Sequence, residues 1–111
     1  MADRGVYNSG DTAKTLSWVV KDRATEAILS LVGISNAIVY VRDAGEAHLI
    51  EITPTTGGAL GTVTFIPGDE ADIAPDVGKK AKLETWAEFD LAGKHYKIPD
   101  TPDTFLMRRD R

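Results

Sequence analysis

The sequence predicts an all-β protein, an antiparallel β-sandwich of about seven strands. Short segments alternate between apolar and polar side chains, which is the two-residue period of a strand with one buried face. Turn-forming Gly, Pro and Asp residues separate these segments, and no segment shows a convincing helical period. A chain of 111 residues is the size of one immunoglobulin-like domain, and a small barrel is the alternative architecture.

Residues 1–11 are predicted to be an extended N-terminal arm, and residues 12–111 a single β-sandwich domain. Turn-forming residues punctuate the arm, and only Val6 and Tyr7 offer apolar surface to bury. The arm is therefore expected to add little to the core and to lie on a neighbouring subunit. Its removal is expected to leave a folded monomer.

The first three predicted strands lie at 15–22, 36–43 and 47–53, and the second and third form a hairpin across Gly45. Trp18 in the first strand is in phase with its apolar neighbours, so it is predicted to be a core residue.

Three further strand segments are predicted in the second half of the chain. They are a strand at 62–67, a long hairpin at 80–99 and a last strand at 104–109. The glycine-rich segment 54–61 is predicted to be a loop, and 100–103 a turn.

Composition excludes several classes of function. The chain has no cysteine, which excludes disulfides, thiolate metal sites and a cysteine nucleophile. Lys and Arg number 13 against 17 Asp and Glu, a net charge of −4 that argues against a nucleic-acid partner. No signal-peptide core is present, and no apolar run approaches the roughly 20 residues of a membrane span. The protein is predicted to be made in a cytoplasm and not to enter a membrane.

Neither a metal site nor an active site is predicted. His48 and His95 have no further His or Cys at ligand spacing. The acidic segment 69–76 (Asp69, Glu70, Asp72, Asp76) offers oxygen ligands for calcium but lacks the EF-hand pattern, so it is predicted to be a solvated loop with Asp69 capping a helical turn. No nucleophile elbow or phosphate loop is present, so no enzyme activity or cofactor is expected.

The predicted functional residues are those of a protein interface. Trp86 is in phase with Glu84 and Glu88, which predicts an outward-facing anchor, although a bulge in the strand would return it to the core. The C-terminal segment combines apolar residues with arginines, which suits docking on an acidic or apolar surface. The candidate interface residues are Arg4, Val6, Tyr7, Trp86, Phe105, Met107, Arg108 and Arg109.

Residues 9–52 and 61–109 resemble the two halves of the N-terminal domain of tailed-phage baseplate upper proteins. The matching features in the first half are Gly10-Asp11, Lys21-Asp22, Leu31-Val32-Gly33 and the strand from Val39 to Arg42. In the second half, a Gly-x-Val strand, a Pro-Gly turn, a long hairpin and a final strand follow in the family's order. The turn before the hairpin departs from the family, because Pro75-Asp76-Val77-Gly78 lacks its usual aromatic residue.

The resemblance implies an immunoglobulin-like sandwich that works as a structural protein of a tailed-phage virion, on the tail tip, the baseplate or a fibre attachment. It implies no catalytic residues. Its expected partners are other virion proteins and further copies of itself, as a trimer or hexamer. The segment has no stalk or receptor-binding head, so another chain is expected to supply the head.

Two alternatives remain open at this stage. One is capsid decoration, in which the same sandwich stabilises the phage head. The other is a carbohydrate-binding or adhesion module, for which Trp86 beside Glu84 and Glu88 is the candidate site.

Overall fold

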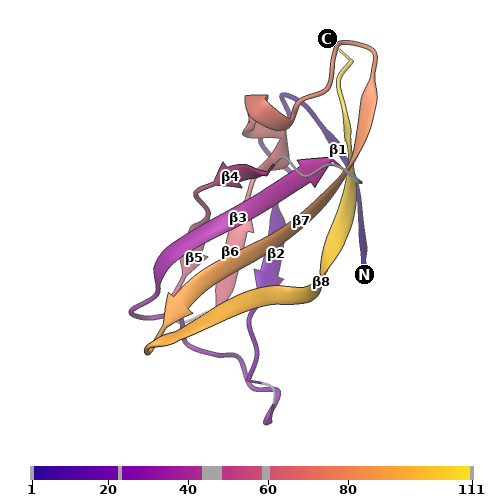
Figure 1. The fold of residues 1–111 in the computed structure, drawn as a ribbon. Helices are drawn as coiled ribbons and strands as arrows, with labels where there is room; N and C mark the ends of the chain where they lie inside the picture. The colour runs from indigo at the N-terminus through magenta and orange to yellow at the C-terminus, as the bar shows by residue number, and fades with distance from the viewer. Residues whose placement is uncertain (1, 23, 44–48, 59–60, 111) are drawn as a thin grey trace.

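The computed structural model describes residues 2–22, 24–43, 49–58 and 61–110. They form one five-stranded and one three-stranded β-sheet, which pack against each other (Figure 1). The predicted all-β sandwich is confirmed.

The larger sheet has the strand order β1-β8-β7-β3-β4, and the smaller sheet has the order β2-β6-β5. The strands of the larger sheet are β1 (Asp3–Asn8), β8 (Lys94–Arg108), β7 (Lys80–Leu91), β3 (Ser35–Asp43) and β4 (Ile50–Ile52). Those of the smaller sheet are β2 (Leu16–Val19), β6 (Thr62–Phe65) and β5 (Thr55–Gly57). Two 3₁₀ turns, η1 (Pro67–Asp69) and η2 (Ala71–Ile73), connect the sheets between β6 and β7.

The core lies between the two sheets and follows the predicted alternation. Trp18 stacks on Phe65 with ring centroids 6.1 Å apart, and Phe65 meets the edge of Phe105 at 6.3 Å. Trp18 is therefore a core residue, as predicted.

The long hairpin of β7 and β8 is also confirmed, and its turn explains its register. Ala92 and Gly93 both have positive φ, 52° and 78°, as a two-residue type I′ turn requires. Such a turn matches the right-handed twist of the strands that it connects.

Replacing Ala92 with Asn is expected to stabilise the protein by roughly 1 kcal/mol, because Asn tolerates left-handed backbone better than Ala does. Ala92→Val should lower stability, since a β-branched side chain is poorly accommodated at positive φ. Urea unfolding of both variants checks the prediction. Equal midpoints for the two variants would contradict it.

The prediction of an N-terminal arm is wrong for residues 3–8. They form β1, which pairs in parallel with the second half of β8. The Tyr7 side chain is only 4% exposed, and its ring meets the edge of Phe105 at 5.6 Å. Only one large apolar side chain of β1 enters the core, so the sequence shows no alternating run there.

A buried carboxylate holds β1 in place. Asp103 accepts hydrogen bonds from the Arg4 guanidinium and from the Trp18 indole N–H, each at 2.9 Å. The backbone N–H of Ala2 donates to the other oxygen of Asp103 at 3.3 Å. Three segments that are distant in the sequence therefore meet at one side chain.

Three further local predictions differ from the structure. The predicted loop 54–61 contains the short strand β5. The predicted turn 100–103 lies within β8. The pairing of β8 with β7 is irregular there, because the pair Ala87–Ile98 is followed along β8 by the pair Thr85–Asp103, and the β8 residues between these two pairs form a bulge. Asp69 ends the 3₁₀ turn η1 and does not cap it.

The predicted hairpin of β3 and β4 is antiparallel, as expected, while Gly45 and His48 lie outside the described residues.

Candidate functional site

Three of the predicted interface residues are buried in the core of the domain. Tyr7, Phe105 and Met107 are 4%, 1% and 0% exposed, because their strands direct them toward the smaller sheet. The prediction that these three residues dock on a partner is therefore wrong. The guanidinium of Arg4 binds Asp103 and the backbone oxygen of Ser17, but its side chain is 26% exposed, so its interface role stays a prediction.

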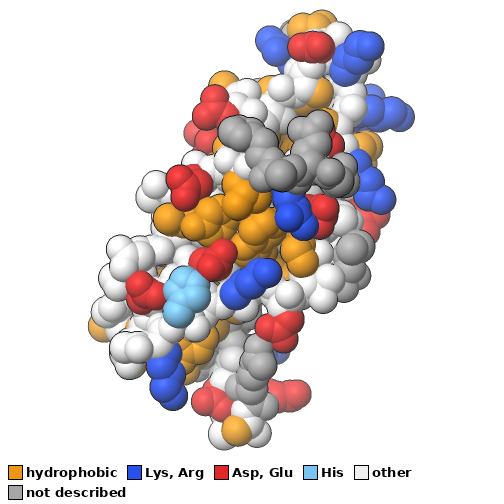
Figure 2. Space-filling model, viewed as in Figure 1, with side chains coloured by type: hydrophobic (Ala, Val, Ile, Leu, Met, Phe, Trp, Pro, Cys, Tyr) orange, Lys and Arg blue, Asp and Glu red, His pale blue; other side chains and the backbone are white. Residues whose placement is uncertain are grey.

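The candidate site that remains is the outer face of the five-stranded sheet. No element of the described chain packs on this face, which Figures 1 and 2 show toward the viewer. Apolar side chains gather over its middle, and charged side chains surround them (Figure 2). The outer face of the smaller sheet differs, since it presents small hydroxyl side chains such as Ser17 and Thr64.

Trp86 lies at the centre of this face, in phase with Glu84 and Glu88 as the alternation predicts. It is nevertheless only 6% exposed. Its ring stacks on Tyr40 of β3, with centroids 5.5 Å apart, because these two residues are paired across the strands. The sequence analysis did not identify Tyr40; its phase in the 36–43 segment, opposite to that of Val39 and Val41, was the available signal.

Charged side chains also cover the Trp86 ring and contribute to its low exposure. The Arg42 guanidinium and the Lys97 ammonium each lie 5.2 Å from its ring centroid, a distance typical of cation–π contacts. The indole N–H donates to Glu88 at 2.9 Å. A sugar ring would have to displace these groups to stack on Trp86.

A chain of hydrogen bonds extends from Trp86 along β7 and β8. His95 Nε2 lies 2.8 Å from Glu88 Oε1, and His95 Nδ1 lies 2.7 Å from Asp90 Oδ1. The amide of Asn36 donates to the second oxygen of Asp90 at 2.9 Å. A doubly protonated imidazole donates to both carboxylates at once, so this arrangement favours the charged form of His95.

The pKa directions agree with this geometry. Hydrogen bonds to Glu88 and then to Asp90 raise the pKa of His95. Hydrogen bonds from His95 and Trp86 lower the pKa of Glu88. The pKa of Asp90 is lowered by its bonds from Asn36 and His95.

His95→Gln should therefore reduce stability in a pH-dependent way. The stabilisation of the folded state by protonated His95 is fully present below the ordinary histidine pKa of 6.5. It disappears as pH rises through the raised pKa of His95 in the folded protein. The stabilisation of the folded state by ionised Glu88 is fully present above the ordinary glutamate pKa of 4.5. It disappears as pH falls through the lowered pKa of Glu88 in the folded protein. The melting temperatures of wild type and variant should differ most between those two pH values.

Thermal unfolding across this range measures the difference. Lys94→Gln is the control, because it removes a neighbouring charge in the same hairpin without touching the His95 bonds. A difference between wild type and His95→Gln that stays constant with pH would contradict the prediction.

The described residues contain no group of three or more His, Cys, Asp or Glu side chains that could hold a metal ion. Glu88 and Asp90 approach different nitrogens of the His95 ring, so they cannot join one nitrogen around a single ion. His48, the other histidine considered, lies outside the described residues.

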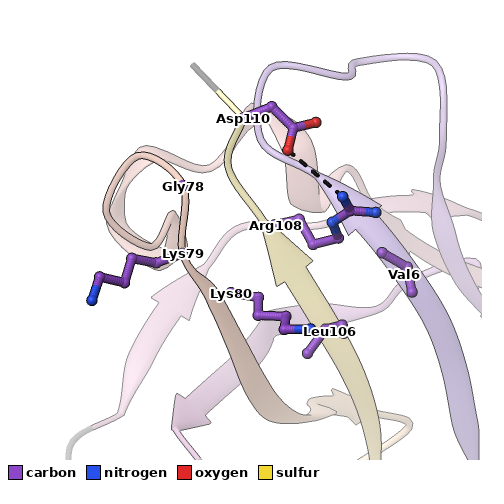
Figure 3. Close-up of a pocket in the computed structure, with 7 residues that line it drawn as sticks. All are labelled: Val6, Gly78, Lys79, Lys80, Leu106, Arg108 and Asp110. Carbon is purple, nitrogen blue, oxygen red and sulfur yellow. Dashed lines mark ion pairs between the residues drawn. The ribbon is translucent and has the colours of Figure 1, made fainter.

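A basic depression occupies the β1 end of the same face. An open hollow of about 420 Å³ lies between β1, β8 and the start of β7 (Figure 3). A smaller hollow of about 220 Å³ adjoins it and shares Val6 and Leu106 with it. We call the combined surface the basic trough. Its apolar floor is Val6 and Leu106, and its charged lining is four cations, Lys79, Lys80, Lys82 and Arg108, and two carboxylates, Asp3 and Asp110.

The basic trough brings together two predicted interface residues, Val6 and Arg108. Val6 is 39% exposed, and Arg108 forms a 3.7 Å ion pair with Asp110 (Figure 3). Leu106 and the lysines were missed, although the KKAK run at 79–82 was visible. The backbone of Arg109 instead extends the sheet, since its N–H donates to Lys79 at 3.1 Å.

The strand edges of the described sheets are short or blocked. In β1, the Lys14 ammonium binds the Val6 carbonyl, and the Asn8 carbonyl accepts a bond from Asp11 at 3.0 Å. β4 and β5 are three residues long. Lysines and short edges are common protections against edge-to-edge pairing, so contacts between subunits are better accommodated by the faces than by the edges.

No helix of the described residues is long and apolar enough to cross a membrane. Comparison of the chain with protein-family models, curated proteins and solved structures finds no match.

Proposed function

We propose that this chain is a non-enzymatic structural protein of a tailed-phage virion, which docks on neighbouring virion subunits through the outer face of its five-stranded sheet. The observation that carries the proposal is the contrast between that open face, with its apolar middle and charged surround, and the blocked edges of the same sheet. The tailed-phage setting rests on the resemblance of residues 9–52 and 61–109 to baseplate upper proteins.

The mechanism in this proposal is passive binding. Trp86 is held in one orientation by Tyr40 and Glu88, so the centre of the face is rigid before a partner arrives. A rigid surface loses little conformational entropy on binding. Repetition of the chain on a symmetric particle then multiplies weak contacts through avidity.

Particles purified from a lysate of the host that carries the gene test the proposal. Mass spectrometry should detect the chain in several copies per particle, and immunogold labelling should place it on the tail tip. Labelling of the head would replace the tail setting with capsid decoration. Absence of the chain from intact particles would overturn the virion role.

A further inference from the structure

The basic trough has an exposed cationic rim around an apolar floor. Lys80 and Lys82 are exposed and form no ion pair with a described residue. Two carboxylates in the lining offset part of this positive charge: Asp110, which lies 3.7 Å from Arg108, and Asp3. This concentration of positive charge stands out on a chain with a net charge of −4, and it attracts an acidic surface.

An acidic surface lies at the same end of the molecule (Figure 1). The acidic segment 69–76 holds four carboxylates and no basic residue. No ion pair joins these carboxylates to a described residue, and Asp69 and Asp72 are exposed. Burial and then the charges of Asp69 and Asp72 raise the pKa of Glu70, so a cationic partner would relieve repulsion within the segment.

The acidic segment adjoins the basic trough without lining it. η1 contacts β1, and Asp76 closely precedes Gly78 on the trough wall, but no residue of 69–76 lines the trough. The acidic segment of a chain therefore does not fill its own basic trough. A second copy that presents its acidic segment to the trough satisfies both surfaces.

We propose that the chain associates head to tail with further copies of itself, the acidic segment 69–76 of one copy docking in the basic trough of the next. The inference rests on the proposed docking function and names the partner and the two surfaces. In a head-to-tail series, one end copy has an unoccupied trough and the other has an unoccupied acidic segment. The series therefore closes into a ring if the rotation between neighbouring copies allows the two ends to meet. A ring fits a component that is repeated around a particle axis.

Charge-reversal variants test the two surfaces separately. The basic-reversed variant carries Lys80→Glu and Lys82→Glu, and the acidic-reversed variant carries Asp69→Lys and Asp72→Lys. All four side chains are exposed, so both variants should keep the wild-type melting temperature. Lys21→Glu with Lys94→Glu is the control for the basic-reversed variant, since it makes the same charge change at exposed positions outside both surfaces.

Sedimentation velocity measures the mass of each protein at concentrations up to about 1 mM, a range that detects weak association. Wild type and control should form species larger than a monomer, which shrink at high salt because exposed charges are screened. Each reversed variant alone should lose association by at least tenfold. An equal mixture of the two should associate again, because it retains one intact pair of surfaces and because the two reversed surfaces are also opposite in charge.

A mixture that stays monomeric overturns the inference. So does association that either reversal leaves unchanged, or a wild type that remains monomeric at low salt. None of these results affects the test on purified particles, which detects a virion protein whatever its partner. Conversely, association of the mixture, from a chain that particles lack, would support the contact and remove the virion role.

Discussion

A variant that lacks residues 1–11 is expected to lose its cooperative fold, because β1 contributes a core residue and the cation of a partly buried ion pair. Truncation of a large buried aromatic side chain costs roughly 3–5 kcal/mol, and Tyr7 is such a residue. Loss of Arg4 adds to that cost by removing the cation beside Asp103. Together these losses consume a large part of the roughly 5–15 kcal/mol that stabilises a domain.

Two point variants in the same strand separate core packing from other effects of β1. Tyr7→Ala should lower the free energy of unfolding by about 3 kcal/mol. Val6→Ala, which alters a partly exposed side chain on the other face, should cost less than about 1 kcal/mol. Guanidinium unfolding followed by tryptophan fluorescence measures both values. A Tyr7→Ala midpoint equal to that of Val6→Ala would show that β1 is dispensable after all.

Asp103→Ala should be nearly as damaging, with a loss of about 2–4 kcal/mol. The substitution leaves the Trp18 indole N–H and the Arg4 guanidinium without their acceptor in a poorly hydrated position. A double-mutant cycle with Arg4→Ala should give a coupling energy above about 1 kcal/mol, because the two side chains are in contact.

The control for Asp103 is Asp76→Ala, which removes an exposed carboxylate of the same charge. That variant should stay within about 0.5 kcal/mol of wild type. A wild-type midpoint for Asp103→Ala would mean that the three donors find solvent or other acceptors, and the proposed role of this carboxylate would be withdrawn.

The alternation of apolar and polar side chains predicted those strands whose own sequence shows that pattern. β7 alternates between apolar and polar side chains except around Thr85 and Trp86, and the Ala92-Gly93 turn fixes its partner. β1 escaped prediction because its partner lies about a hundred residues away and its pattern has one large buried side chain. β5 is a three-residue strand in a segment whose glycines favour a loop.

The site was predicted less well than the fold, for a related reason. The phase of Trp86 gave the face on which it lies, but the pairing of β3 with β7 brings Tyr40 against its ring. Similarly, the basic trough joins Val6 of β1 to Lys80 of β7 across β8. Such neighbours are set by strand order, which local patterns do not contain.

The pairing of β1 with β8 also governs when the domain can form. Asp3 is paired with Thr104, so a nascent chain that has released β1 must extend by about a hundred residues before the partner strand exists. Chain closure over such a distance is entropically costly, and folds dominated by distant contacts form in about milliseconds to seconds. During synthesis Tyr7 therefore remains exposed until β8 has been made, and β1 joins the sheet only after all the strands that follow it in the sequence.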